Sequence, residues 1–213
     1  MEKKTDFRSL STKAKAQYIW DYYKFHIFAV LVGIIAVGTI IRQQLAYREP
    51  LLNVIMINCN DPYGADAGGF DEFLLSEGYD LNEHPVSLFS SLQFSDDEYA
   101  LSYQNTQVLV AMIAAGGQDL FFGTGDIYLN YAENGALLDL STVLPAETLD
   151  ALEGHLIYST DNGESDPYPC AIELTDNEWL TKNNYYNTCY FGIFYQTENP
   201  DAAVAFATFL LEY

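Results

Sequence analysis

The longest apolar stretch of the chain lies near its start, at residues 25–41, where FHIFAVLVGIIAVGTII contains no formal charge. Its seventeen residues would rise about 26 Å as an α-helix, slightly less than the hydrocarbon core of a bilayer at about 30 Å. Aromatic side chains typical of a membrane interface precede the run, at Tyr18, Trp20, Tyr22 and Tyr23. The pattern predicts a transmembrane helix over residues 25–41; a buried core helix is the alternative.

Beyond residue 50, short apolar runs alternate with segments of helical period. These runs predict strands at residues 51–57, 86–94, 120–122, 170–174 and 190–195. A helix that contains Phe70, Phe73 and Leu74 is predicted to end at Gly78. Three further helices are predicted, from Ser102 to Ala115, from Asp126 to Gly135 and from Pro200 onward. Residues 145–169 are predicted to be irregular. The β-α-β-α-β-α order predicts an α/β domain of three layers around a mostly parallel sheet.

Charge divides the chain at the apolar run. Residues 1–48 carry eight basic and three acidic side chains, whereas residues 49–213 carry 27 acidic side chains and one base, Lys182. The formal net charge of −21 is therefore the sum of +5 and −26. Six basic residues precede the run and two follow it, so the positive-inside rule predicts a cytoplasmic N-terminus.

The predicted organisation has four parts. Residues 1–24 form a cytoplasmic basic and aromatic juxtamembrane segment, 25–41 the transmembrane helix, 42–50 a linker and 51–213 an extracytoplasmic α/β domain. The expected location is the cell membrane, with an uncleaved signal anchor crossing it once. A cleaved signal peptide is the alternative, because Ala36 and Gly38 form a small-x-small pattern.

The acidity narrows the range of partners. A pI near 4.1 argues against nucleic acid, which is bound by clustered Lys and Arg, and disfavours anionic solutes. The expected partners are the lipid bilayer, through residues 25–41, and either a small neutral or cationic solute or an envelope or transporter protein.

Motifs for catalysis, cofactors and metals are not found. His26, His84 and His155 have no neighbours at metal-ligand spacing, and no nucleophile elbow or phosphate-binding loop is present. We therefore expect no enzyme activity, no cofactor and no metal. Residues 161–166 contain three carboxylates that could hold Ca²⁺, but a solvated loop is the preferred interpretation.

The three cysteines, Cys59, Cys170 and Cys189, do not form a C-x-x-C motif. Cys170 and Cys189 lie in two late strands and could form a disulfide outside the cell. Buried free thiols are the preferred interpretation.

Polar residues follow two of the predicted strands, where open α/β sheets bind ligands. Asn58, Asn60 and Asp61 follow the first strand, and Thr124 and Asp126 follow the third. Two nearby aromatic residues, Tyr63 and Tyr128, could stack on a sugar or a cationic group. These seven residues form a candidate ligand-binding site; the alternative is that they only cap helices and turns.

Two segments resemble a known family. AMIAAGGQDLFFGTGDIYLNYAENGALLDLSTVL and the ending FGIFYQTENPDAAVAFATFLLEY are similar to the extracellular solute-binding proteins of bacterial ABC importers, with the type 2 periplasmic-binding-like fold. Members usually have two lobes. Here only residues 145–169 separate the first similar region, which ends at residue 144, from the late strands that belong to the same lobe. The second lobe is therefore expected to be missing or reduced to this loop. The resemblance implies one membrane-anchored lobe with a ligand-binding or interaction role. The alternative is a structural or assembly protein whose external domain binds another protein.

Overall fold

The computed structural model describes residues 11–95, 99–160 and 166–213. The chain divides into two compact units, Met1–Tyr47 and Arg48–Tyr213.

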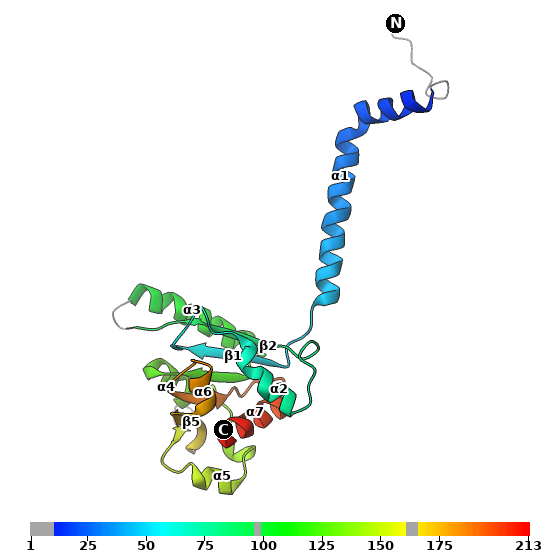
Figure 1. The fold of residues 1–213 in the computed structure, drawn as a ribbon. Coiled ribbons are helices and arrows are strands. Elements are labelled where there is room, and N and C mark those ends of the chain that lie inside the picture. Colours follow the sequence, from blue (N-terminus) through cyan, green and yellow to red (C-terminus); the bar gives the residue numbers. More distant parts are fainter. Residues whose placement is uncertain (1–10, 96–98, 161–165) are drawn as a thin grey trace. The chain divides into compact units, whose positions relative to one another are not determined.

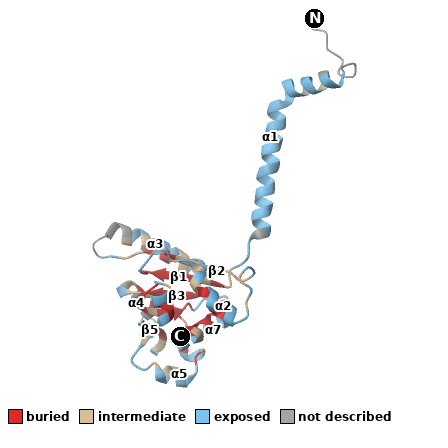
Figure 2. Cartoon of the chain, in the orientation of Figure 1, coloured by how far each residue is buried: buried red, intermediate tan, exposed pale blue. Residues whose placement is uncertain are grey.

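The described residues of the first unit form the helix α1 (Thr12–Ala46), which is 35 residues long. Its described side chains are almost all exposed (Figure 2), and residues Trp20–Leu45 have a mean hydropathy of 2.2. The helix extends beyond the predicted 25–41 at both ends, because neither Gly nor Pro interrupts its flanks. Its length and apolarity suffice to span a membrane, which is also true of a signal sequence.

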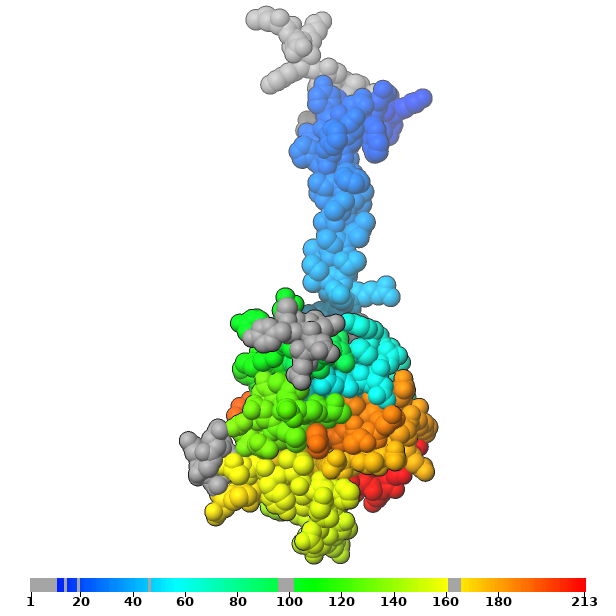
Figure 3. Space-filling view, turned by 90° about the vertical axis from the view of Figure 1, so that its left-hand side faces the viewer, coloured from blue at the N-terminus to red at the C-terminus, as the bar shows by residue number. Residues whose placement is uncertain are grey.

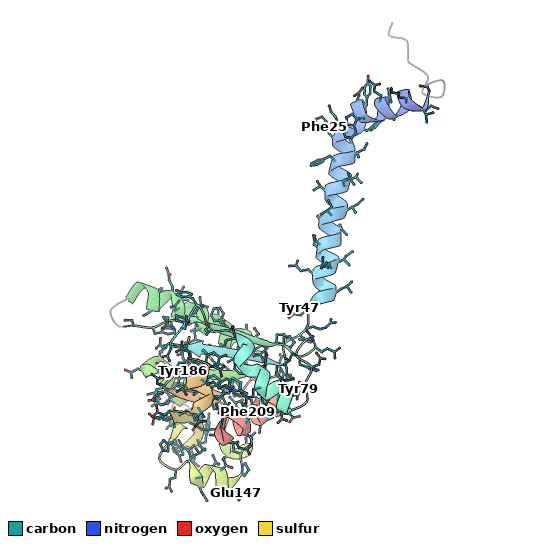
Figure 4. The ribbon with its side chains drawn as sticks, in the orientation of Figure 1. Phe25, Tyr47, Tyr79, Glu147, Tyr186 and Phe209 are labelled. Atoms are coloured by element: carbon teal, nitrogen blue, oxygen red, sulfur yellow. The ribbon has the colours of Figure 1, made fainter. Side chains whose placement is uncertain are left out.

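The helix α1 bends close to Phe25 (Figure 4). The bend separates the segment with basic and aromatic side chains from the apolar segment that follows. Within the first segment, the rings of Tyr18 and Tyr22 lie 4.6 Å apart between centroids, since residues four apart share one helix face.

A β-sheet forms the centre of the second unit (Figure 1). Among the described residues it has six strands, in the order β2-β1-β3-β6-β5-β4. The strands are β1 (Leu52–Ile57), β2 (Val86–Leu92), β3 (Leu120–Gly123), β4 (Leu156–Ser159), β5 (Tyr168–Thr175) and β6 (Thr188–Ile193). Strand β1 pairs in parallel with β2 and β3, whereas the pairs β3–β6, β6–β5 and β5–β4 are antiparallel. The prediction of a mostly parallel sheet is therefore wrong; the sheet is mixed.

Connection length explains one of the antiparallel pairs, β4–β5. Parallel strands need a crossover of roughly a dozen residues or more, usually with a helix, and the segments that join β1 to β2 and β2 to β3 are of this kind. Only eight residues, 160–167, separate β4 from β5, which is too few. Residues 176–187 join β5 to β6 with a single short helix, and they return the chain in the opposite direction.

Helices cover both faces of the sheet. They are η2 (Ala67–Phe70), α2 (Asp71–Ser76), α3 (Tyr99–Ala115), α4 (Gly125–Glu133), η3 (Leu140–Thr142), α5 (Ala146–Ala151), α6 (Glu178–Lys182) and α7 (Pro200–Glu212). Buried residues of α2, α6 and α7 belong to one core cluster, and those of α3 and α4 to another. The strands between them are mostly buried (Figure 2).

Alternation along β1 divides its side chains between the two clusters. Leu52, Val54 and Met56 point into the first, and Ile55 and Ile57 into the second. The first cluster is rich in aromatic rings, which include the labelled Tyr186 and Phe209 (Figure 4). All three cysteines are free and buried.

Three local predictions differ from the structure. Helix α3 begins at Tyr99, so Ser102 lies inside it; its Oγ accepts a hydrogen bond from Ser95 N at 3.0 Å and donates one to Ser95 O at 2.8 Å. Residues 145–169, predicted to be irregular, contain α5 and β4. Asp126 is not the N-cap of α4, which begins at Gly125 after Thr124. Asp161 and Glu164, two of the three candidate Ca²⁺-binding carboxylates, lie outside the described part of the chain.

Candidate ligand-binding site

A cavity of about 610 Å³ opens beside the carboxyl ends of the three parallel strands. Three segments form it: the residue after β1, the stretch from the end of β2 into α3, and the first turn of α4. The lining residues are Asn58, Phe94, Ser95, Ser102, Thr106, Gly125, Asp126 and Ile127. Parallel strands place these segments at one edge of the sheet, where open α/β sheets bind ligands.

Asn58 joins the three segments. Its Oδ1 accepts a hydrogen bond from Phe94 N at 2.7 Å, and its Nδ2 donates one to Thr124 O at 3.2 Å. Its own backbone N donates to Leu92 O at 2.9 Å. The residue adopts a left-handed conformation, with φ of 55°, which Asn tolerates better than most residues. Asn58 therefore fixes the floor of the cavity.

The first turn of α4 supplies the charge of the site. Gly125 has φ of 81°, a conformation open to glycine at little cost, and it turns the chain from β3 into the helix. Asp126 follows in the first helical turn with its side chain exposed, where the helix dipole favours a carboxylate. Burial raises the pKa of nearby Tyr190, and the charges of Glu173 and Asp126 raise it further.

The remaining wall combines hydroxyl groups with apolar surface. Ser95, Ser102 and Thr106 supply the hydroxyls, and the Thr106 Oγ1 donates to Ser102 O at 2.8 Å. Phe94 and Ile127 supply the apolar surface. Among the described residues that line the cavity none is basic, so the site suits a neutral or cationic group better than an anion.

The structure brings two of the seven predicted site residues, Asn58 and Asp126, to this cavity. Thr124 lies beside it and contributes its carbonyl to Asn58. Tyr128 is buried instead, stacked on Phe121 at 4.5 Å, and its hydroxyl donates to Phe121 O at 3.4 Å.

The other three predicted residues lie away from the cavity lining. Asn60 N donates to Tyr185 O at 2.9 Å, and Asp61 Oδ1 accepts a hydrogen bond from Gly64 N at 2.8 Å. Tyr63 is exposed. Asn60 thus contacts the segment before β6, and Asp61 stabilises a local turn. Both contacts agree with the alternative that some of the seven residues only shape local structure.

Sequence reasoning missed the contribution of the segment after β2. Phe94, Ser95, Ser102 and Thr106 line the cavity, whereas the predicted site includes residues only after the first and third strands. The signal was present, because β2 is also predicted to be parallel to β1 and its carboxyl end lies at the same edge of the sheet.

The cysteines and acidic residues form no metal centre in the described part of the chain. Cys170 belongs to the core cluster on the α4 side of the sheet, whereas Cys189 belongs to the cluster on the α7 side. The sheet therefore separates these two thiols. Burial raises the pKa of Cys170 to about 12, which keeps its thiol protonated and unreactive.

Comparison with models of known protein families, with curated proteins and with solved structures returned no match for this chain. The resemblance to solute-binding proteins therefore stays a prediction from sequence.

Proposed function

We propose that the chain is a single-pass membrane protein whose α/β domain lies on the extracytoplasmic side and binds a small neutral or cationic solute. The observation that carries the solute-binding role is the cavity of about 610 Å³ at the carboxyl ends of β1, β2 and β3. Its volume falls within the range of small-molecule sites, about 300–1,000 Å³.

The proposed membrane anchoring rests on α1 and on the charge division. Trp20–Leu45 is long and apolar enough to span a bilayer, and basic residues precede it while the acidic domain follows. The positive-inside rule favours a cytoplasmic N-terminus for this distribution. The external domain is then strongly acidic, which attracts cations to the cavity and repels anions.

Within the cavity, Asp126 has a specific role in this proposal. It is the one charged residue among the described lining residues, so it would pair with an ammonium group or accept hydrogen bonds from a sugar hydroxyl. The hydroxyls of Ser95 and Thr106 would complete the polar contacts, with Phe94 against the apolar part of the solute.

The alternative is a structural or assembly protein whose external domain binds another protein. It is favoured by the architecture, because the described residues of the domain form one lobe around one sheet. A cavity whose walls come from a single lobe buries less of a small ligand than a cleft between two lobes does.

Isothermal titration of the full chain in detergent against neutral sugars, polyamines, amino acids and short peptides tests solute binding. We expect one class to bind, and Asp126→Asn to weaken that binding at least tenfold if the ligand is cationic. Glu147→Gln is the matched control, since Glu147 lies in the first turn of α5 (Figure 4), which contributes nothing to the lining. Binding of an envelope protein with no binding of any solute would instead favour the alternative.

A further inference from the structure

The outer face of α3 is unusual for a domain this acidic. The helix sequence, YALSYQNTQVLVAMIAA, contains no ionisable acid or base apart from tyrosine, although residues 49–213 carry 27 acidic side chains. Helix α3 lies at the surface of the domain, partly in view in green in Figure 3. Among the side chains of α3 that the structure describes, the exposed ones, here called the neutral face, are Tyr103, Gln104, Gln107, Val108, Val110, Ala111, Ala114 and Ala115.

Polarity changes along the helix. Residues 102–107 read SYQNTQ, whereas residues 108–115 read VLVAMIAA and are apolar on every side. Only part of this second half faces the core: Leu109 is buried, yet Val108 and Val110 are 41% and 49% exposed. A helix segment that is apolar all round is normally covered on all sides, so an occupant for the outer side is expected.

The apolar half lies at the end of the sheet where the chain enters the domain. Asp119, four residues after α3 ends, exchanges two hydrogen bonds with Asn53 near the start of β1. Only five residues, 47–51, separate the end of α1 from the start of β1. Even fully extended, they span no more than about 20 Å.

We propose that the neutral face docks on the surface of the lipid bilayer that α1 crosses; this inference rests on the proposed anchor. Counted from residue 41, where the predicted transmembrane segment ends, residues 42–46 of α1 add only about 8 Å to this span. The connection therefore keeps the entry end of the domain near the bilayer, and the apolar half of α3 is at that end. Carboxylates would lose hydration in such a contact, and this face has none. Tyr103, which is 57% exposed, suits the headgroup region, where tyrosine is enriched.

The test uses the full chain in lipid nanodiscs of phosphatidylcholine, with an environment-sensitive fluorophore attached at Val110→Cys. The native cysteines are buried and should not react in the folded protein, which labelling of the unsubstituted chain verifies. We expect blue-shifted emission and at least twofold quenching when brominated lipids replace ordinary ones. The same probe at Ala114→Cys, a second position on the neutral face, should respond in the same way. This rules out that the response arises from local disruption by the substitution at Val110.

The matched control is Leu75→Cys on α2. Leu75 is 61% exposed and belongs to a helix that packs on the opposite face of the sheet. Its probe should stay in water and show no quenching by brominated lipid. Equal responses at Val110, Ala114 and Leu75 would overturn the proposal.

Two further outcomes separate this inference from its rivals. When nanodiscs are in large excess over the chain, each holds at most one copy. If the blue shift of the probe at Val110 disappears under that condition, the neutral face is covered by a second copy of the chain, and bilayer docking is overturned. A chain that does not enter nanodiscs at all overturns the anchor and the docking together, whereas a chain that enters with an unquenched probe overturns the docking alone.

Discussion

The carboxylate of Asp119 accepts a 2.7 Å hydrogen bond from the backbone N of Asn53, and Asp119 N donates back to Asn53 O at 2.8 Å. The same carboxylate, fully buried, also accepts hydrogen bonds from the hydroxyl of Thr197 and from Asn199 N. One side chain thus connects β1, β3 and the start of α7. A buried carboxylate is retained at low cost only when it is satisfied in this way.

Removal of this carboxylate should destabilise the domain strongly. We expect Asp119→Ala to lower the free energy of unfolding by about 3 kcal/mol, because it leaves buried donors without an acceptor. Asp119→Asn, which keeps one acceptor, should cost less. Thermal unfolding of the full chain in detergent, followed by near-ultraviolet circular dichroism, measures both, and equal stabilities for Asp119→Ala and the unsubstituted chain would contradict the expectation.

Asn58 offers a second test, directed at the cavity. Asn58→Ala removes the hydrogen bonds to Phe94 and Thr124 and places alanine at φ of 55°, so we expect a loss of about 2–3 kcal/mol. Asn58→Gly loses the same bonds without the backbone strain and should lose roughly 1 kcal/mol less. Denaturant unfolding of the two variants separates these contributions; equal losses would show that backbone strain plays no part.

Some elements of the fold could be predicted from the sequence and others could not. The strands β1, β3 and β6 were predicted to within a few residues, because apolar runs bounded by turn residues are strong local signals. The left-handed glycines Gly78 and Gly135 end helical segments as predicted. Direction and neighbourhood of the late strands were not predictable, since the pairing of β3 with β6 joins residues about 70 positions apart and leaves no local trace.

The candidate site shows the same division. Asn58 and Asp126 could be found because they directly follow predicted strands, and topology then brings strand ends together. Tyr128 is close to Asp126 in sequence, yet its ring is buried against Phe121 and does not line the cavity. The orientation of one residue within a helical turn depends on packing, which the pattern alone does not specify.

Repulsion among the acidic side chains should make stability depend on salt. Residues 49–213 carry a formal charge of −26, and the one lysine among them, Lys182, is already paired with Glu72 at 2.9 Å. Because salt screens repulsion between surface charges, the unfolding temperature of the domain should rise between 20 and 500 mM NaCl. Potassium chloride should act alike; an effect seen only with Na⁺ would indicate specific ion binding instead.

The buried thiol of Cys170 should make the free energy of unfolding fall at alkaline pH. Its pKa is raised from the ordinary 9.0 to about 12, mainly by burial, so the folded state favours the protonated thiol. The resulting stability is fully present below pH 9 and is lost between about pH 9 and 12, at up to about 1.4 kcal/mol per pH unit. Cys170→Ala should therefore flatten the decline in that interval.

Equilibrium denaturation of the full chain in detergent at pH 8, 9, 10 and 11 measures this slope. Ser159→Ala is the matched control: Ser159 is buried in the strand that pairs with β5, and its hydroxyl donates to Glu133 O at 3.0 Å, but it does not titrate. It should lower stability by a similar amount at every pH and leave the slope unchanged. Identical slopes for Cys170→Ala and the unsubstituted chain would show that this thiol does not govern alkaline unfolding.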